Sequence, residues 1–118
     1  MARHNVVGKS GEDYACEYLR SLRYKIILQN FKTKVGEIDI VAKERSQYVF
    51  VEVKTRSSHY FGTPAEAITP KKLLSLVRAG EYYLLTNNFG QNYRIDAIEV
   101  DVKDNGEYTI NHIKNITS

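Results

Sequence analysis

The sequence predicts a single α/β domain. Its 118 residues are the length of one ordinary domain, and a hydrophobic fraction of 42% with 26% charged residues is typical of globular proteins. Hydrophobic periodicity along the chain gives the order helix, three strands, helix, two strands. Because helices and strands alternate in this way within one short chain, we expect residues 1–118 to fold as one α/β unit.

The first predicted element is a helix over residues 11–22. Ser10-Gly-Glu-Asp13 is a capping-box pattern, which marks the start of a helix. The apolar and aromatic residues that follow recur at helical spacing: Tyr14, Ala15, Tyr18, Leu19 and Leu22. This spacing predicts an amphipathic helix.

Three strand-like segments follow, at residues 24–31, 36–42 and 48–55. The first contains the β-rich run Ile26-Ile27-Leu28, and the other two alternate between apolar and polar residues. The short polar connection 43–47 predicts a hairpin between the second and the third segment. Alternation places Ile38, Ile40 and Ala42 on one face of the second segment, and Val49, Val51 and Val53 opposite Phe50, Glu52 and Lys54 in the third.

The middle of the chain has two helix-start patterns. Thr63-Pro-Ala-Glu66 is a capping-box pattern that predicts one short turn. At Thr69-Pro70 a capping residue again precedes proline, which is favoured at the first helical position. Apolar residues at helical spacing then continue, so we expect a longer helix that ends near Asn87-Asn88.

Two strands complete the prediction, at residues 93–102 and 107–116. Asp104-Asn-Gly106 lies between them and is a strong hairpin-turn sequence. Both segments alternate as strands do. We interpret Arg94 and Asp96 in the first of them as partners in a cross-strand ion pair.

Composition excludes several classes of site. Cys16 is the one cysteine, so neither an internal disulfide nor a multi-cysteine zinc site can form, and we expect a buried thiol. His4, His59 and His112 lack metal-ligand spacing and are predicted to lie at the surface or at an edge. The chain has no apolar run of membrane-spanning length and no secretory pattern, so we expect a cytoplasmic protein without membrane contact. A net charge of +3 tilts only mildly towards polyanions.

One segment places charged residues where they are rare. Gly36-Glu-Ile-Asp39 is followed by Val51-Glu-Val-Lys54-Thr-Arg56, although Glu and Lys are depleted in strands. Alternation puts Glu52 and Lys54 on the same face of their strand. These residues are therefore candidates for a functional site.

The hairpin strands can pair in two neighbouring registers, which set Asp39 against either Val51 or Glu52. One register brings two carboxylates together with Lys54 beside them. Carboxylates that repel each other favour a hard divalent cation such as Mg²⁺, and a metal-bound water beside a lysine can attack a phosphodiester. The alternative is a hairpin with a structural Glu–Lys pair and an exposed Asp39.

Several segments together resemble a known family: Gly8 to Leu22, Asn30, Gly36-Glu-Ile-Asp-Ile-Val-Ala42, Val49-Phe-Val-Glu-Val-Lys-Thr-Arg56, Phe61-Gly-Thr-Pro64, Lys71-Lys72 and Tyr93-Arg-Ile-Asp96. They look like the YraN family of predicted endonucleases, which is similar in fold to archaeal Holliday-junction resolvases and the wider PD-(D/E)XK nuclease superfamily. The resemblance covers about residues 8 to 100. It implies a restriction-endonuclease-like fold, with a central mixed β-sheet flanked by helices.

The resemblance also implies roles for individual residues. Asp39 and Glu52 would be metal ligands for Mg²⁺ or Mn²⁺, and Lys54 would be the catalytic lysine. The backbone carbonyl of Val53 often completes the metal shell in such sites. Glu12 matches an additional acid that resolvase-like members present from the first helix, although an acid at a helix N-terminus also interacts favourably with the helix dipole.

Basic residues near this site are candidate contacts for nucleic-acid phosphates. They are Arg56, Lys71 and Lys72, with solvated surface charge as the alternative for each lysine. The two lysines lie in the first turn of a helix, where positive charge opposes the macrodipole, so a role other than helix stability is indicated. Four of the nine tyrosines lie at core-like helical spacings, which favours packing over base stacking: Tyr14, Tyr18, Tyr82 and Tyr83.

The resulting hypothesis is a Mg²⁺- or Mn²⁺-dependent endonuclease that hydrolyses phosphodiester bonds in branched or otherwise structured DNA, with DNA favoured over RNA as the partner. Two alternatives stay open: a non-catalytic nucleic-acid-binding module with the same fold, and a structural subunit whose basic edge docks a partner protein. The complete set of Asp39, Glu52 and Lys54 favours an enzyme. Resolvase-like enzymes commonly act as dimers because two strands have to be cut, so a homodimer is compatible with the resemblance.

Overall fold

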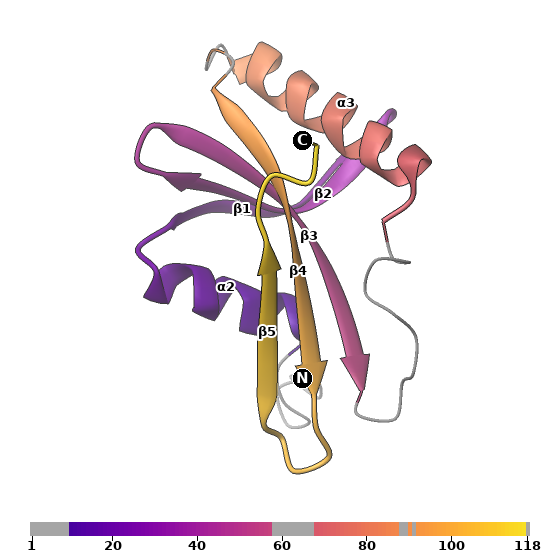
Figure 1. The fold of residues 1–118 in the computed structure, drawn as a ribbon. Helices are drawn as coiled ribbons and strands as arrows, with labels where there is room; N and C mark the ends of the chain where they lie inside the picture. The colour runs from indigo at the N-terminus through magenta and orange to yellow at the C-terminus, as the bar shows by residue number, and fades with distance from the viewer. Residues whose placement is uncertain (1–9, 58–67, 88–89, 91, 118) are drawn as a thin grey trace, which may run out of the picture.

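The structure, a computed structural model, describes residues 10–57, 68–87, 90 and 92–117. The elements follow one another in the predicted order, helix, three strands, helix, two strands (Figure 1). They are α2 (Gly11–Ser21), β1 (Lys25–Thr33), β2 (Gly36–Glu44), β3 (Gln47–Ser57), α3 (Pro70–Asn87), β4 (Tyr93–Val102) and β5 (Tyr108–Ile113). The α/β class predicted from periodicity is thereby confirmed.

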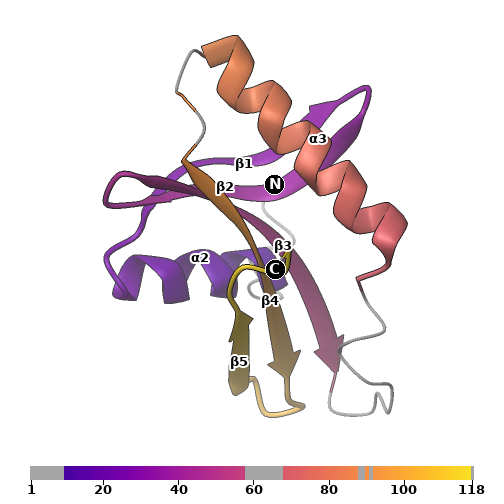
Figure 2. The same cartoon turned by 45° about the horizontal axis from the view of Figure 1, so that its top comes forward.

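The strands form one mixed five-stranded sheet in chain order, β1-β2-β3-β4-β5. β3 and β4 are parallel and are joined through α3, whereas the other neighbouring strands are antiparallel. Figures 1 and 2 show α2 and α3 covering opposite faces of this sheet. A separate apolar core lies under each helix. This is the predicted mixed sheet flanked by helices. No helix in the described ranges is long and apolar enough to cross a membrane.

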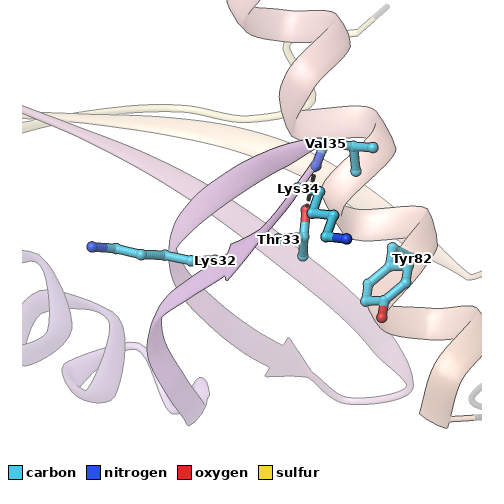
Figure 3. A pocket seen from close by; sticks show the side chains of 5 residues that line it. All are labelled: Lys32, Thr33, Lys34, Val35 and Tyr82. Carbon is cyan, nitrogen blue, oxygen red and sulfur yellow. Dashed lines mark hydrogen bonds between the residues drawn. The ribbon is translucent and has the colours of Figure 1, made fainter.

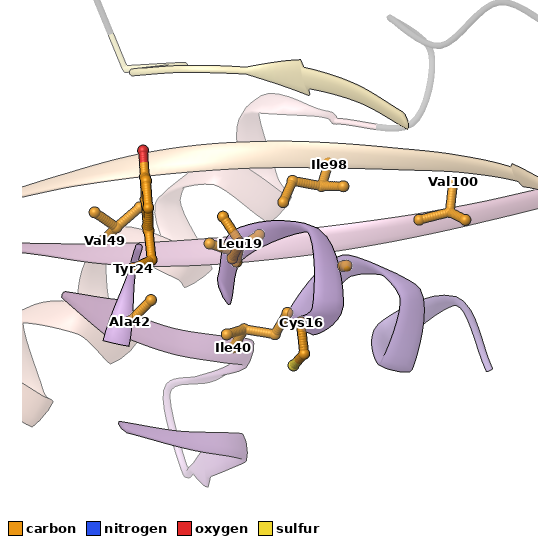
Figure 4. Packing of buried hydrophobic residues seen from close by; sticks show 10 residues of the cluster. Cys16, Leu19, Tyr24, Ile40, Ala42, Val49, Ile98 and Val100 are labelled. Carbon is orange, nitrogen blue, oxygen red and sulfur yellow. The ribbon is translucent and has the colours of Figure 1, made fainter. Parts of the chain in front are cut away.

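The start of α2 is fixed by the predicted capping box. The backbone N–H of Asp13 donates to Ser10 Oγ at 3.2 Å, and the backbone N–H of Ser10 donates to the Asp13 carboxylate at 3.0 Å. The buried face of the helix packs on the sheet, and Cys16 is 2% exposed, as expected of a buried thiol (Figure 4). The core on this face comprises Ala15, Cys16, Leu19, Tyr24, Ile40, Ala42, Val49, Val51, Ile98 and Val100.

The core on the α3 face corrects one prediction. Ile38 packs here rather than with Ile40 and Ala42 on the α2 face. The cause lies in β1, where Asn30 has a left-handed backbone (φ 56°) that interrupts the alternation; Ile38 pairs with Phe31 just beyond it. The buried members of this core are Ile38, Val41, Tyr48, Phe50, Leu76, Ala79, Tyr83, Leu84 and Ile95.

The helix α3 begins as predicted. The hydroxyl of Thr69 accepts a hydrogen bond from the backbone N–H of Lys72 at 3.0 Å, and Pro70 occupies the first helical position. Tyr83 is buried, but Tyr82 is 49% exposed, so the prediction of a core position for Tyr82 is wrong. Adjacent residues on a helix point about 100° apart and cannot both face the sheet.

Some of the sequence predictions fall outside the described residues. They concern the capping-box pattern at residues 63–66, the segment Phe61-Gly-Thr-Pro64, and the histidines His4 and His59. The turn at Asp104-Asn-Gly106 is present, and Gly106 adopts a φ of 89° that favours glycine. The hairpin between β4 and β5 therefore forms where its turn sequence predicts.

A polar network lies buried on the α2 face of β4. Arg94 Nε donates to Asp96 at 3.0 Å, which confirms the ion pair but places both partners on one strand, since residues two apart share a face. Asp96 is fully buried, and its carboxylate lies 2.8 Å from Nε2 of His112, whose Nδ1 lies 2.9 Å from the hydroxyl of Tyr18. His112 is on the edge strand as expected, but its side chain is only 5% exposed because Asp96 holds it inward.

Candidate active site

The register of the β2–β3 hairpin decides where the two acids lie. Ile40 pairs with Val51, and the backbone ladder between the strands ends at this pair. Continued by one residue, this register sets Asp39 opposite Glu52. Of the two registers that the sequence allowed, the structure therefore has the one that brings the carboxylates together.

Asp39 is held at the point where the two strands stop pairing. Its Oδ2 accepts a hydrogen bond from the backbone N–H of Val53 at 2.8 Å. The side chain thus satisfies a β3 donor that the ladder leaves without a backbone acceptor. The negative charge of the same carboxyl group also acts on Glu52, whose pKa it raises. This arrangement fixes the position of Asp39 before any ligand binds.

Glu52 is the buried acid of the pair. Glu52 is 4% exposed. Burial, together with the negative charge of Asp39, raises its pKa to about 7. Two ammonium groups partly offset this effect: Lys72 Nζ lies 3.6 Å and Lys54 Nζ 3.9 Å from Glu52 Oε2. Near neutral pH Glu52 is therefore only partly ionised, and a cation could replace its proton.

Glu12 approaches Asp39 from another element, α2, closely enough for the charge of Asp39 to act on it. Burial and then the charge of Asp39 raise the pKa of Glu12, while Gln29 donates a hydrogen bond to its Oε1 at 3.3 Å. The first turn of α2 sits tightly on the sheet, because a Cβ at Gly11 would overlap the side chain of Thr55 on β3. Close packing of α2 against β3 thus brings Glu12 within electrostatic range of Asp39.

The basic residues separate into two groups. Lys72 and Lys54 direct their ammonium groups at Glu52. Lys71 is exposed in the first turn of α3, and Arg56 is half-buried two residues beyond Lys54 on β3, on the same face by alternation. Contacts of Arg56 and Lys71 with phosphates stay predictions.

The donor set fits a hard cation. In the described part of the chain, no three His, Cys, Asp or Glu residues are grouped as a metal site. Mg²⁺ keeps several waters, however, and one or two carboxylates suffice to bind it. Asp39 and Glu52 supply these two. Burial and then repulsion from Asp39 raise the pKa of Glu52, and a cation would relieve the repulsion.

Sequence reasoning missed two features of this site. Lys72 was expected as a phosphate contact or a solvated surface charge, whereas it is an ion-pair partner of Glu52. The sequence signal for this role was a lysine in the first turn of a helix, where its positive charge opposes the helix dipole. Gln29, which binds Glu12, could not have been found, because its position depends on the interrupted alternation of β1.

Comparison with known proteins gives a consistent assignment. The model of "Uncharacterised protein family UPF0102" matches residues 11–100. UPF0102 proteins of Alkaliphilus oremlandii and Caldicellulosiruptor saccharolyticus are each 46% identical to this chain over 112 residues, covering 92% of it and 95% and 94% of the relatives. UPF0102 protein FP2501 of Flavobacterium psychrophilum is 40% identical over 114 residues, covering 97% of this chain and 95% of the relative. The predicted YraN-like resemblance is confirmed, and the chain belongs to the UPF0102 family.

Proposed function

We propose that this protein is an endonuclease that uses Mg²⁺ or Mn²⁺ to hydrolyse phosphodiester bonds in branched or otherwise structured DNA. The observation that carries the proposal is the meeting of Asp39 and Glu52 at the end of the β2–β3 ladder, with the ammonium groups of Lys54 and Lys72 within 3.9 Å and 3.6 Å of Glu52. Paired carboxylates beside a lysine suit metal-assisted attack on a phosphodiester.

Each residue of the pair has a distinct task in this proposal. Asp39 and Glu52 would hold the cation, together with the backbone carbonyl of Val53 that the family resemblance implies. When bound, the metal supplies a water of lowered pKa and neutralises charge at the phosphate. Because the Val53 N–H already orients Asp39 at 2.8 Å, binding needs little rearrangement of that ligand.

Lys54 acts on the reacting phosphate. Its side chain is 39% exposed, whereas that of Glu52 is 5% exposed, so the ammonium stands between the buried acid and solvent. From there it can orient the attacking water and stabilise the charge that develops on the phosphate oxygens. Lys72, which lies on α3, holds Glu52 in position through its ion pair. Glu12, whose pKa is raised by burial and by Asp39, would assist a second cation.

The partner in this proposal is nucleic acid. Arg56 and Lys71 would contact phosphates near the reacting bond, because each is close in the chain to a lysine whose ammonium group lies beside Glu52. A junction has two strands to cut, and a homodimer would supply one such site for each.

A cleavage screen tests the proposal. The full chain is incubated with Mn²⁺ and with labelled four-way junction, flap, single-stranded and duplex DNA. We expect the branched substrates to be cut, with activity lost in Asp39→Asn and retained in Glu107→Gln, a matched change at an exposed position outside the site. Absence of cleavage of every substrate would contradict the proposal, and binding without cleavage would favour the non-catalytic module instead.

A further inference from the structure

A cleft lies between the β1–β2 hairpin and α3, outside the carboxylate site. It has a volume of about 580 Å³ and is lined by Lys32, Thr33, Lys34, Val35 and Tyr82. Figure 3 shows the Tyr82 ring reaching from α3 towards the hairpin, with Lys34 and Val35 on the facing side and Lys32 extending away. The volume falls within the range of roughly 300–1,000 Å³ that holds groups of small-molecule size.

The cleft leads to the proposed active site. A second hollow shares its hairpin residues and continues along Gly36 and Glu37 to Ser75 and Lys72 of α3. The ammonium of Lys72 lies 3.6 Å from Glu52. A chain molecule whose reacting bond lies at Glu52 can therefore pass Lys72 and enter the cleft beneath the hairpin.

Tyr82 offers an aromatic surface at the far end of this path. The ring is tilted against Phe31, with 6.4 Å between the ring centroids, and the residue is still 49% exposed. Its neighbour Tyr83 is 4% exposed and makes the contacts with the core. The contact with Phe31 therefore uses only part of the Tyr82 ring, and about half of the residue stays open to solvent.

The opposite wall of the cleft is held in place. The hydroxyl of Thr33 accepts hydrogen bonds from the backbone N–H groups of Val35 and Gly36, at 3.0 Å and 3.1 Å. Ser75 of α3 donates to the carbonyl of Val35 at 3.3 Å, and a Cβ at Gly36 would overlap Ser75. The tip of the hairpin is thus fixed on α3, so the cleft exists before a ligand enters.

We infer that this cleft binds an unpaired stretch of DNA, with one base stacked on Tyr82 and the adjacent phosphate beside Lys34. Aromatic rings combined with a positively charged groove are the usual means of binding single strands. Inside a duplex both faces of each base are covered by neighbouring bases, and a base at the end is held by its pairing partner. An unpaired base is free to enter the cleft and present a face to Tyr82. Lys34 is exposed and pairs with no carboxylate within the described ranges, which leaves its charge available. The inference rests on the proposed function and narrows its substrate class to DNA with a single-stranded stretch.

Binding is compared for a duplex with a single-stranded overhang and for a blunt duplex, each end-labelled with a fluorophore. The full chain carries Asp39→Asn, so that cleavage does not consume the DNA. We expect Tyr82→Ala to weaken overhang binding about 5- to 100-fold, as the loss of one stacked base predicts, with blunt-duplex affinity unchanged. Tyr82→Phe, which keeps the ring, should bind as before, and so should Leu85→Ala, a change on α3 outside the cleft.

Two further readings test the same contact. A 2-aminopurine in the overhang should be quenched on binding, and this quenching should be lost in Tyr82→Ala but kept in Tyr82→Phe. Lys34→Ala should flatten the dependence of log affinity on log salt for overhang DNA by about 0.7, the value for one phosphate of a single strand. Melting temperatures show that each variant is folded.

Three results would overturn the inference. Tyr82→Ala could lose affinity equally for both DNAs, it could lose affinity for neither, or the Asp39→Asn protein could bind neither DNA. Its failure is distinguishable from failure of the proposed function. If the wild-type protein cuts branched DNA but Tyr82→Ala does not change overhang binding, the nuclease proposal stands and the cleft inference fails. If Tyr82→Ala selectively loses overhang binding but the wild-type protein cuts no DNA, the cleft inference stands and the nuclease proposal fails.

Discussion

The chemistry of Glu52 depends on whether its surroundings hold a cation. In the metal-free protein, burial and Asp39 raise the pKa of Glu52 from its ordinary 4.5 to about 7. Between these values the folded state binds more protons than the unfolded state, so this group makes folding less favourable as the pH rises. The contribution begins near pH 4.5 and is complete above pH 7.

The first prediction concerns this pH dependence. Without divalent metal, the free energy of unfolding of the wild-type protein should fall relative to that of Glu52→Gln by on the order of 3 kcal/mol between pH 4.5 and 8. The variant has no carboxylic acid at this position to titrate. Urea denaturation of both proteins across that range measures the difference, with Glu107→Gln as the control. Parallel profiles for wild type and Glu52→Gln would show that Glu52 is not perturbed.

The second prediction concerns metal binding. At pH 8, Mg²⁺ or Mn²⁺ should raise the melting temperature, because a ligand of the folded state stabilises it by about 2.7 kcal/mol at 100 times its dissociation constant. Asp39→Asn should lose most of this increase, since a neutral amide replaces one of the two carboxylates. A full increase in the variant would remove Asp39 from the metal site.

The third prediction separates catalysis from structure at Lys54. Lys54→Met should lower the single-turnover cleavage rate about 10²- to 10³-fold, as loss of one electrostatic group at the transition state does. Its stability should change little, because Lys72 still lies 3.6 Å from Glu52. Cleavage with saturating Mn²⁺ and thermal melts of the same samples measure both effects, with Lys25→Met as a control at an exposed site. Wild-type rates in a folded Lys54→Met protein would show that the active site is assigned wrongly.

At the scale of elements, α3 approaches β3 at a glycine. A Cβ at Gly80 would lie 2.6 Å from the ring of Phe50, which is fully buried and has little room to move. The helix therefore needs a residue without a side chain here, even though glycine lowers helix propensity. This packing also fixes the height of α3 above the strand that carries Glu52 and Lys54.

The fourth prediction follows from that contact. Gly80→Ala gains about 1 kcal/mol of helix propensity but overpacks the core, which typically costs about 1–3 kcal/mol. We expect the second effect to prevail and the free energy of unfolding to fall by roughly 1 kcal/mol. Arg78→Ala on the exposed side of the same helix should lack the packing cost. Equal or greater stability of Gly80→Ala in urea denaturation would mean that Phe50 can yield.

At the scale of the whole molecule, the network around Asp96 joins segments distant in the sequence. Hydrogen bonds from His112 and Arg94 hold the pKa of Asp96 below its usual range, although burial opposes them. The carboxylate also accepts the backbone N–H of Asn115 at 2.9 Å, and His112 contacts Tyr18 of α2. One acid thus links α2, β4, β5 and the segment that follows β5.

The fifth prediction concerns this network. Asp96→Asn should lower the free energy of unfolding by about 1.5–3 kcal/mol, because the charge-assisted hydrogen bonds of Asp96 with Arg94 and His112 are weakened, although Arg94 keeps its ion pair with Glu44 at 2.9 Å. Urea denaturation monitored by circular dichroism measures the loss. A reduction similar to that of Asp101→Asn, which changes an acid on the same strand outside the network, would show that the network contributes little beyond ordinary packing.

Local signals in the sequence were sufficient to predict which elements form. Ser10 with Asp13 and Thr69 with Pro70 mark the starts of α2 and α3, and the structure confirms both because caps involve residues within one turn. The five strands lie where the period-two pattern predicts them, with ends that differ by a few residues. Strand ends differ because pairing with a neighbour, as at Glu44 with Gln47, extends a strand beyond its pattern.

Only the tertiary structure decided how these elements assemble the site. The sequence left two registers open, and Asp39 faces Glu52 because β2 and β3 pair in one of them. Lys72 reaches Glu52 because α3 folds back over β3, and Ile38 changes face because Asn30 interrupts the neighbouring strand. These placements depend on contacts between residues far apart in the chain, whereas caps and periodicity report only on residues a turn or two apart. The sequence by itself therefore determined the elements and the types of residue at the site, and packing between elements determined which of them meet.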